Sequence, residues 1–316
     1  SLGLLCKGKA VRCRFIKDNL QDYPLSLSCR ILQVSRSGYY HWIKRRTQQR
    51  RQQEDKILLL INKHYKLSRG RYGFRKITKA IRKEGIIINR KRVYRLMKNN
   101  GIFSRTKKKF KVTTKQDSAA SFSANLLNGK FEAEMKNQIW SSDITYIRTN
   151  EGWMYLAVVL DVYNREIIGW SLSQRAASDL VVKALTMAVS KRKPQAGVIF
   201  HSDRGSQYTS SSVRYLLSKY GFRQSMSGKG NCYDNAITET FFSTLKKELV
   251  YLTEFETRQQ AESEIFEFIE IFYNRKRLHS SLGYLSPVDF GMNKKTENKK
   301  EEIRINNNQT VAYLSV

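Results

Sequence analysis

Three carboxylates in unlike surroundings are the residues of this chain that could do chemistry together. Asp143 lies within the strand-like run IWSSDITYI, and Asp203 ends a second such run, VIFHSD. Glu239 lies in AITETFFSTLKKE, which has the pattern of a helix. Carboxylate oxygens are the ligands that Mg2+ prefers. Two Mg2+ ions held by all three acids, with Mn2+ as a substitute, would suit in-line displacement at a phosphate without a side-chain nucleophile.

The helix that carries Glu239 has one apolar face. At about 100° per residue, that stripe spans about 120° and consists of Ile237, Phe241, Leu245 and Leu249. Glu239 lies about 200° from Ile237 on this wheel, and Lys246 lies about 180° from it. The two residues therefore share the face opposite the core, where Lys246 would meet a substrate phosphate as a point charge.

A sheet must bring the two aspartates together. Residues 131–290 alternate between β-branched or aromatic runs and helical patterns in the order β-β-β-α-β-α-β, followed by helices. We expect strands over 137–149, 153–164, 165–173, 197–203 and 222–227, with helices over 178–192 and 211–221. This order predicts an α/β domain with a mixed five-stranded sheet flanked by helices. If the fourth strand pairs with the first, Asp143 and Asp203 reach the same edge of a cleft.

Each acid taken alone has an ordinary structural explanation. Asp143 could hydrogen-bond at a strand end, Asp203 could be a turn residue, and Glu239 could be an exposed helical side chain. Their joint occurrence in this order favours the metal cluster. We interpret Asp161 as a turn residue and Asp234 as a helix N-cap.

His201 and Cys232 lie near the acids in sequence. For His201, a contact near the substrate and a structural role are equally compatible with its position in the strand. Cys232 has no histidine close in sequence to activate it, so we interpret it as incidental.

The composition points to a polyanionic partner. The 316 residues suit two or three domains, and 58 Lys and Arg against 27 Asp and Glu give a net charge of +31. Double-stranded DNA is the leading candidate. We find neither a signal peptide nor an apolar run of about 18 residues, so we expect a soluble, intracellular protein and no membrane partner. The four cysteines and four histidines form no zinc or disulfide pattern.

Residues 1–103 read as helical, and the basic character extends through residue 130. Residues 1–50 read as short helices, a helix-turn-helix candidate with a turn at 35–40, and 51–103 as a helix-turn-helix or winged-helix module. In the second, a core of Ile77, Ile81, Val93, Leu96 and Met97 is expected, with Asn89 capping a helix. Residues 104–130 read as a basic linker lying along DNA.

The basic residues of this half are expected to contact DNA, although a solvated helical face is the alternative. In the linker they are Lys107, Lys108 and Lys109. In the helical module they are Arg71, Arg75, Lys76, Lys79, Arg90, Lys91, Arg92 and Arg95.

Residues 253–283 read as one long helix that packs Ile265, Phe268, Ile269 and Phe272 on the sheet. For Asn274, Arg275, Arg277 and His279, DNA contact and a structural role are equally compatible with the sequence. Of these we assign Arg275 and Arg277 to DNA. Residues 291–316 form a polar tail that orders only against a partner, if at all.

Several phrases together resemble a known family. They are RYGFRKITKAI, NRKRVYRLMKNNGI, FHSDRGSQYTS, GNCYDNAITETFFSTLKKE and FYNRKRLHSSLGYLSPVDF, which cover roughly residues 50–290. In this order they look like the DDE transposases of the insertion-sequence-three family, OrfB type, and they are similar to the retroviral integrase core. The resemblance implies an RNase H-like catalytic domain in which Asp143, Asp203 and Glu239 are catalytic, Mg2+-binding residues and Lys246 accompanies them. Arg204, Asn231 and Tyr233, in the same phrases, are then expected at DNA.

The resemblance also implies binding to terminal inverted repeats, 3′-end cleavage and strand transfer into target DNA. The chain would act as a homo-oligomer, a dimer or larger, in a synaptic complex in the bacterial cytoplasm, nucleoid-associated when bound to DNA. Complete transposases of the family often carry an upstream leucine zipper, and residues 1–50 show no leucine heptad, so we expect an upstream portion to be absent here. The alternatives are an RNase H-like nuclease without strand transfer and a non-catalytic regulator that only binds DNA.

Overall fold

The computed structural model describes residues 8–106, 123–127, 132–228 and 236–293. The chain divides into two compact units, residues 1–104 and 105–316. The described part of the first unit consists of helices joined by turns and loops, and the second unit contains the sheet. Each unit has its own apolar core.

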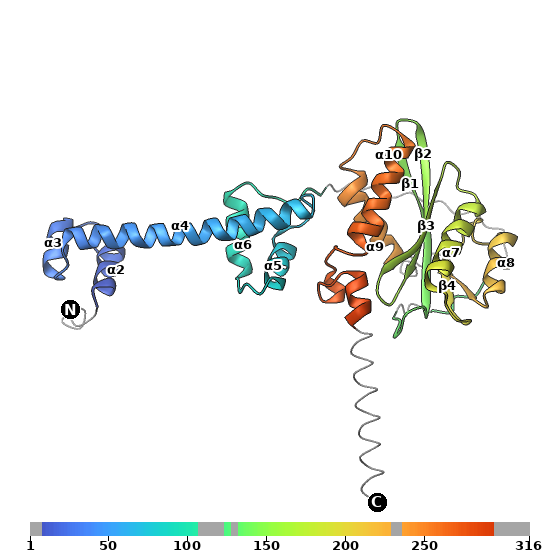
Figure 1. The fold of residues 1–316 in the computed structure, drawn as a ribbon, viewed down its shortest axis with the longest axis horizontal. Coiled ribbons are helices and arrows are strands. Elements are labelled where there is room, and N and C mark those ends of the chain that lie inside the picture. The colour runs from blue at the N-terminus through green and yellow to red at the C-terminus, as the bar shows by residue number, and fades with distance from the viewer. Residues whose placement is uncertain (1–7, 107–122, 128–131, 229–235, 294–316) are drawn as a thin grey trace, which may run out of the picture. The chain divides into compact units, whose positions relative to one another are not determined.

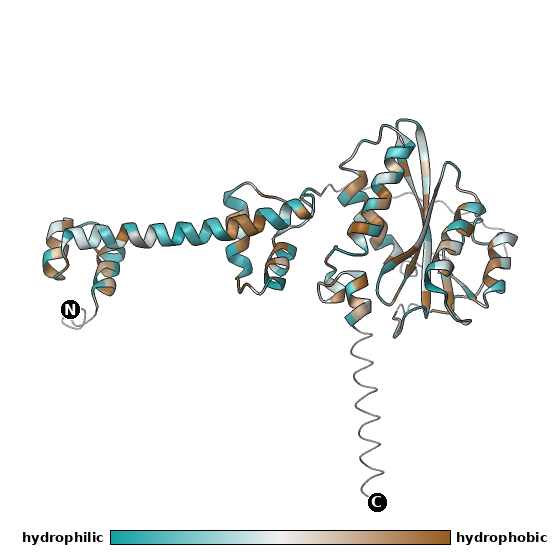
Figure 2. Ribbon diagram, viewed as in Figure 1, coloured by the Kyte–Doolittle hydropathy of each residue, from teal (hydrophilic) through white to brown (hydrophobic). Residues whose placement is uncertain are grey.

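The first unit contains five helices in its described part. They are α2 (Lys9–Asn19), α3 (Leu25–Ile31), α4 (Arg36–Leu67), α5 (Phe74–Lys83) and α6 (Arg90–Asn99). Ser35 caps α4 by accepting a hydrogen bond from the Gly38 N–H at 3.1 Å, so the turn before α4 ends earlier than the expected 35–40. α4 runs through the expected boundary at residue 50 on a stretch of strong helix formers that is hydrophilic in Figure 2.

The expected core of the module after residue 51 is confirmed. Ile61 of α4 is fully buried, as are Ile77, Ile81 and Val93. Asn89 caps α6 by accepting a hydrogen bond from the Lys91 N–H at 2.8 Å. No strand occurs in the described part of this unit, so a helix-turn-helix arrangement fits it better than a winged helix.

The second unit is built on the expected five-stranded sheet. Its strands are β1 (Ile139–Thr149), β2 (Gly152–Asp161), β3 (Glu166–Ser173), β4 (Ile199–Ser202) and β5 (Arg223–Met226), in the order β3-β2-β1-β4-β5. β1, β2 and β3 are antiparallel neighbours, whereas β4 is parallel to both β1 and β5. The pairing of β4 with β1 that the site requires is therefore present.

Helices cover the two faces of the sheet (Figure 1). α7 (Ser178–Arg192) and α8 (Ser211–Lys219) bury one face in a core that includes Trp140, Phe200 and Phe222. α9 (Ala236–Leu245), the π-helical turn η2 (Lys246–Val250), α10 (Arg258–Phe266) and the π-helical turn η3 (Glu267–Tyr273) lie on the other face. A short 3-10 turn, η4 (Ser280–Leu282), follows.

The long helix expected over 253–283 is shorter in the structure. Thr257 caps its start by accepting a hydrogen bond from the Gln260 N–H at 3.1 Å. Its end is set by Asn274, whose side chain pairs with the backbone of Ile167 in β3 through two 2.9 Å hydrogen bonds. The expected packing residues Ile265, Phe268, Ile269 and Phe272 are all buried.

Candidate active site

Asp143 and Asp203 lie at the same level of two neighbouring parallel strands. Ser141 of β1 pairs with His201 of β4, and each aspartate follows its paired residue by two positions. β4 ends at Ser202, so Asp203 lies just past its carboxyl end, whereas β1 continues to Thr149. The parallel pairing thus brings together two acids that are far apart in sequence.

A buried pair of hydroxyl groups attaches α9 at this level. Ser141 Oγ and Thr238 Oγ1 are 2.6 Å apart, and both residues are fully buried. Because side chains alternate along a strand, Ser141 and Asp143 point to the same face of β1. Glu239 follows Thr238 directly and is exposed while Ile237 and Phe241 are buried, so the wheel placed Glu239 on the correct face.

The charges of these residues act on one another. The pKa of Asp143 is raised to about 7, chiefly by burial and then by the negative charges of Asp203 and Glu239. The Ile144 N–H, which donates to Asp143 Oδ1 at 2.7 Å, and the positive charge of Lys246 oppose this rise. The Asp203 side chain is exposed, yet partial desolvation by the surrounding protein raises its pKa. The Gly205 N–H, which donates to Asp203 Oδ1 at 3.0 Å, lowers this pKa in part.

This donor set fits a divalent cation. It consists of carboxylates alone, and a half-buried carboxylate whose pKa is raised by two further anions favours a cation beside it. In the described residues, however, no three potential ligands lie close enough to enclose one ion. Glu239 lies four residues after the segment 229–235, which is outside the described residues. Cys232 and Asp234 belong to that segment.

Lys246 lies in the π-helical turn η2 that continues α9. Its Nζ is 4.8 Å from the centre of the Tyr146 ring, a cation–π contact. Sequence reasoning found Lys246 but missed Tyr146, because the wheel did not show which strand residue the lysine would meet.

A hydroxyl network behind the aspartates was also missed. Ser142 Oγ donates to the Val158 carbonyl at 2.8 Å and lies 3.0 Å from the Tyr208 hydroxyl. Burial, followed by the charges of Asp143 and Asp203, raises the pKa of Tyr208 well above its usual value, so this phenol stays neutral. Two adjacent serines beside the apolar residues that open this strand were the available signal, because buried hydroxyls need partners.

His201 and Arg204 have structural roles in the described site. His201 is fully buried, with Nδ1 2.9 Å from Ser225 Oγ and Nε2 3.3 Å from Ser227 Oγ. Arg204 Nε donates to the Ser227 carbonyl at 2.7 Å, which joins the ends of β4 and β5. Asp161 accepts hydrogen bonds from the N–H groups of Asn137 and Tyr163, as expected of a turn residue.

Comparison with known proteins decides the family. Two family models described as integrase core domains match residues 133–232 and 239–294, respectively, and the model of an HTH-like domain matches residues 52–110. The chain is 41% identical over 281 residues to the transposase InsF for insertion sequence IS3A of Escherichia coli (strain K12), covering 87% of this chain and 96% of the relative. The chain belongs to the IS3 family of transposases. It is thus a DDE transposase, and the expected recognition is confirmed.

Other relatives of the transposase have similar sequence identity to it and are matched over most of their length. An uncharacterized 31 kDa protein of insertion element IS600 from Shigella sonnei is 43% identical over 83% of this chain and 96% of its own length. The transposase for insertion sequence element IS904 of Lactococcus lactis is 45% identical over 74% and 91%. Among solved structures, the HTLV-2 integrase catalytic core domain in complex with magnesium is similar at 14% identity and a TM-score of 0.40, over 51% of this chain and 99% of that one.

The HTH-like domain of the transposase displays most of the cations expected at DNA. Arg75, Lys79, Arg90, Lys91 and Arg95 are exposed, while Lys76 and Arg92 are half-buried. Arg95 also pairs with Glu54 at 3.0 Å. Arg71 is a correction: it is only 8% exposed, so it belongs to the interior of the domain. Lys107, Lys108, Lys109, Asn231 and Tyr233 lie outside the described residues.

Arg277 is a second correction. Its guanidinium donates to both carboxylate oxygens of Glu248, at 3.1 and 2.8 Å, and the two side chains are only 13% and 8% exposed. The pair ties η2 to the segment after η3. Arg275 is exposed and stays a candidate for DNA, while His279 is buried against the Tyr273 ring.

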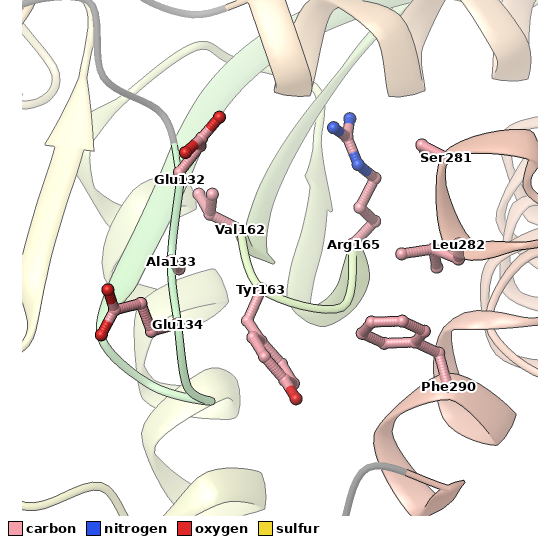
Figure 3. Close-up of a pocket in the computed structure, with 9 residues that line it drawn as sticks. All are labelled: Glu132, Ala133, Glu134, Val162, Tyr163, Arg165, Ser281, Leu282 and Phe290. Atoms are coloured by element: carbon pink, nitrogen blue, oxygen red, sulfur yellow. The ribbon is translucent and has the colours of Figure 1, made fainter.

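The second unit also has a cavity of about 540 Å3 (Figure 3). Its walls come from residues 132–134, the turn after β2 and the segment 281–290, and they include Tyr163, Arg165 and Phe290. None of the three acids lines it, so it adds nothing to the candidate active site. In the described part of the transposase, no helix is long and apolar enough to span a bilayer.

Proposed function

We propose that this transposase binds the terminal inverted repeats of its element and catalyses Mg2+-dependent 3′-end cleavage and strand transfer. Asp143, Asp203 and Glu239 are the proposed metal ligands. The observation that carries the proposal is the parallel pairing of β1 with β4, which sets Asp143 and Asp203 at the same level, and the raised pKa of Asp143 agrees with it. Divalent metal dependence is the general property of integrase-type cores, and the choice of Mg2+ follows from an all-carboxylate donor set.

Each residue has a distinct task in this proposal. Asp143, Asp203 and Glu239 would hold two divalent ions, whose charge would make a water or 3′-hydroxyl a better nucleophile and would stabilise the leaving oxygen. Asp143 and Asp203 supply fixed carboxylates from adjacent strands, and Glu239 supplies a third from α9. The Ser141–Thr238 contact sets the height of α9 against β1. Lys246 offers its positive charge to a phosphate beside the carboxylates.

The partners follow from the chemistry of transposition. Cleavage of both element ends requires two active sites to meet two DNA ends, so we propose a homo-oligomer, a dimer or larger, that acts in a synaptic complex. The exposed cations of the HTH-like domain would bind the repeats, through phosphates first and base edges second. Bacterial relatives support action on nucleoid DNA in the cytoplasm.

One assay separates this function from its alternatives. The full chain is incubated with labelled terminal-repeat DNA and Mg2+, and wild type is compared with Asp203→Asn. The proposal predicts that wild type gives joined products. It predicts that Asp203→Asn binds the DNA but gives no products. Hydrolysed products without joining would indicate a nuclease instead. Binding without either product would indicate a regulator. Full activity in Asp143→Asn, Asp203→Asn and Glu239→Gln would refute the proposed mechanism.

A further inference from the structure

Two large aromatic side chains are left half-exposed beside the candidate active site. Tyr146 of β1 is 47% exposed and Trp153 of β2 is 49% exposed. Their ring centres are 5.3 Å apart, with 79° between the ring planes. Aromatic residues in strands usually bury most of their surface, so an exposed pair of this size indicates a binding surface.

The aromatic pair adjoins the carboxylates through Lys246. The lysine Nζ lies 4.8 Å from the Tyr146 ring centre, and its charge also lowers the pKa of Asp143. Tyr146 follows Asp143 by three residues along β1. β4 pairs with β1 only at Ile139–Ser141, so the edge of β1 near Tyr146 has no strand beside it.

The chemistry of this surface matches a nucleotide. The two rings meet edge to face, so they do not stack on each other. About half of each side chain is exposed even with Lys246 beside Tyr146, which leaves ring surface for a third flat ring. Nucleobases stack on such rings whatever their sequence, and an adjacent cation can hold the phosphate of the same nucleotide. A base inside an intact duplex is already stacked on its neighbours, so the occupant must be unpaired.

We propose that Tyr146 and Trp153 stack an unpaired base at the DNA end, next to the phosphate that is cut. Lys246 then binds a phosphate of the same strand. This inference rests on the proposed function, because it takes the carboxylates to be where the DNA is cut. It assigns the aromatic pair to substrate positioning, and opening the terminal base pairs becomes part of binding.

Abasic nucleotides test the contact. Terminal-repeat duplexes that lack one base at successive positions around the cut are titrated with the full chain, with Ca2+ replacing Mg2+ so that binding is read apart from cleavage. For wild type, one position should weaken binding roughly five- to hundredfold, the range for a stacked base. For Trp153→Ala and Tyr146→Ala, the same abasic site should cause no further loss.

Matched variants guard against a folding defect. Trp153→Phe and Tyr146→Phe keep a flat ring and should keep the abasic effect. Tyr215→Ala removes an aromatic side chain of α8 that is 69% exposed, and it should bind like wild type at every position. Circular dichroism checks that each variant is folded.

The result separates this inference from the proposed function. If abasic effects in the alanine variants equal those of wild type at every position, the stacking inference is wrong, even where Mg2+-dependent joining is intact. An abasic effect that depends on Trp153, in a protein that never joins DNA, would support stacking and contradict only the proposed reaction. An aromatic pair that instead contacts a protein partner would show no dependence on any base.

Discussion

Asp143 is the residue at which folding stability and the proposed metal binding make opposite demands. Its carboxyl has a pKa of about 7 because it is buried near two other acids. A folded-state pKa above the ordinary value means that the charged form destabilises the folded protein, increasingly from about pH 4 to 7. Such a carboxylate is poorly suited to stability and well suited to binding a cation.

Replacing Asp143 should therefore stabilise the metal-free protein. We predict that Asp143→Asn raises the melting temperature of the second unit by roughly a few degrees at pH 8, and by less as pH falls toward 4. The asparagine oxygen can still accept from the Ile144 N–H. Thermal unfolding monitored by tryptophan fluorescence in EDTA measures this. An equal or lower melting temperature at pH 8 would argue against the burial described for Asp143.

Metal binding should depend on pH for the same reason. Cation binding must displace the proton that Asp143 holds below about pH 7, so affinity for Mg2+ or Mn2+ should fall by roughly tenfold for each pH unit below 7. Calorimetric titration at pH 6 and 8, in buffers of different ionisation enthalpy, reports both the affinity and the released proton. Equal affinities without proton release would exclude Asp143 as a ligand.

At the scale of the elements, the Glu248–Arg277 pair holds η2 to the segment after η3. Removing one partner of a buried pair leaves an uncompensated charge, so Arg277→Ala should destabilise the second unit by about 3–5 kcal/mol. Arg275→Ala is the matched control, because its side chain is exposed two residues away, and it should change stability by less than about 0.5 kcal/mol. Urea denaturation measures both. Similar stability with weakened DNA binding in Arg277→Ala would restore the original DNA assignment.

The packing of α7 on β3 depends on a glycine. A Cβ added at Gly169 would lie 2.1 Å from the Ala184 carbonyl oxygen and 2.7 Å from the Ala188 nitrogen, both backbone atoms. We predict that Gly169→Ala destabilises the unit by roughly 3 kcal/mol, since a helix must shift to admit a methyl group. Urea denaturation measures the change. A loss of stability below about 1 kcal/mol would mean that α7 packs less tightly on β3 than described.

Periodicity predicted the elements well, and the contacts between them poorly. The alternating runs located all five strands, and the helical wheel placed Glu239 correctly, because burial imposes those periods. The partners of Lys246, Arg277 and Arg204 depend on which strand or turn lies opposite each side chain. The periodicity of the sequence does not show which segments lie opposite one another. Glu248 could have been found, since it falls about 20° from Ile237 on the wheel and a carboxylate within a core stripe needs a partner.

At the scale of the molecule, the proposed function assigns DNA recognition to the HTH-like domain and the chemistry to the integrase core domain. The exposed cations of the HTH-like domain predict DNA binding that weakens with salt by a slope of about 0.9 per neutralised phosphate. Charge removal at Arg75 and Lys79 together should lower that slope by up to about 2. Lys183→Gln is the control, because that lysine already pairs with Asp179 at 2.7 Å on α7. An unchanged slope in the double variant would move DNA binding away from this face.

The central claim is that Asp203 and Glu239 act by holding metal, and exchange of the ligand atom tests it most directly. Asp203→Cys and Glu239→Cys offer a thiolate, which Mg2+ binds poorly and the softer Mn2+ accepts better. Joining of labelled terminal-repeat DNA is measured in each metal, with wild type as reference. The account predicts that both variants are inactive in Mg2+ and partly restored in Mn2+. Wild-type activity in Mg2+, or loss of activity that Mn2+ does not relieve in either variant, would contradict it.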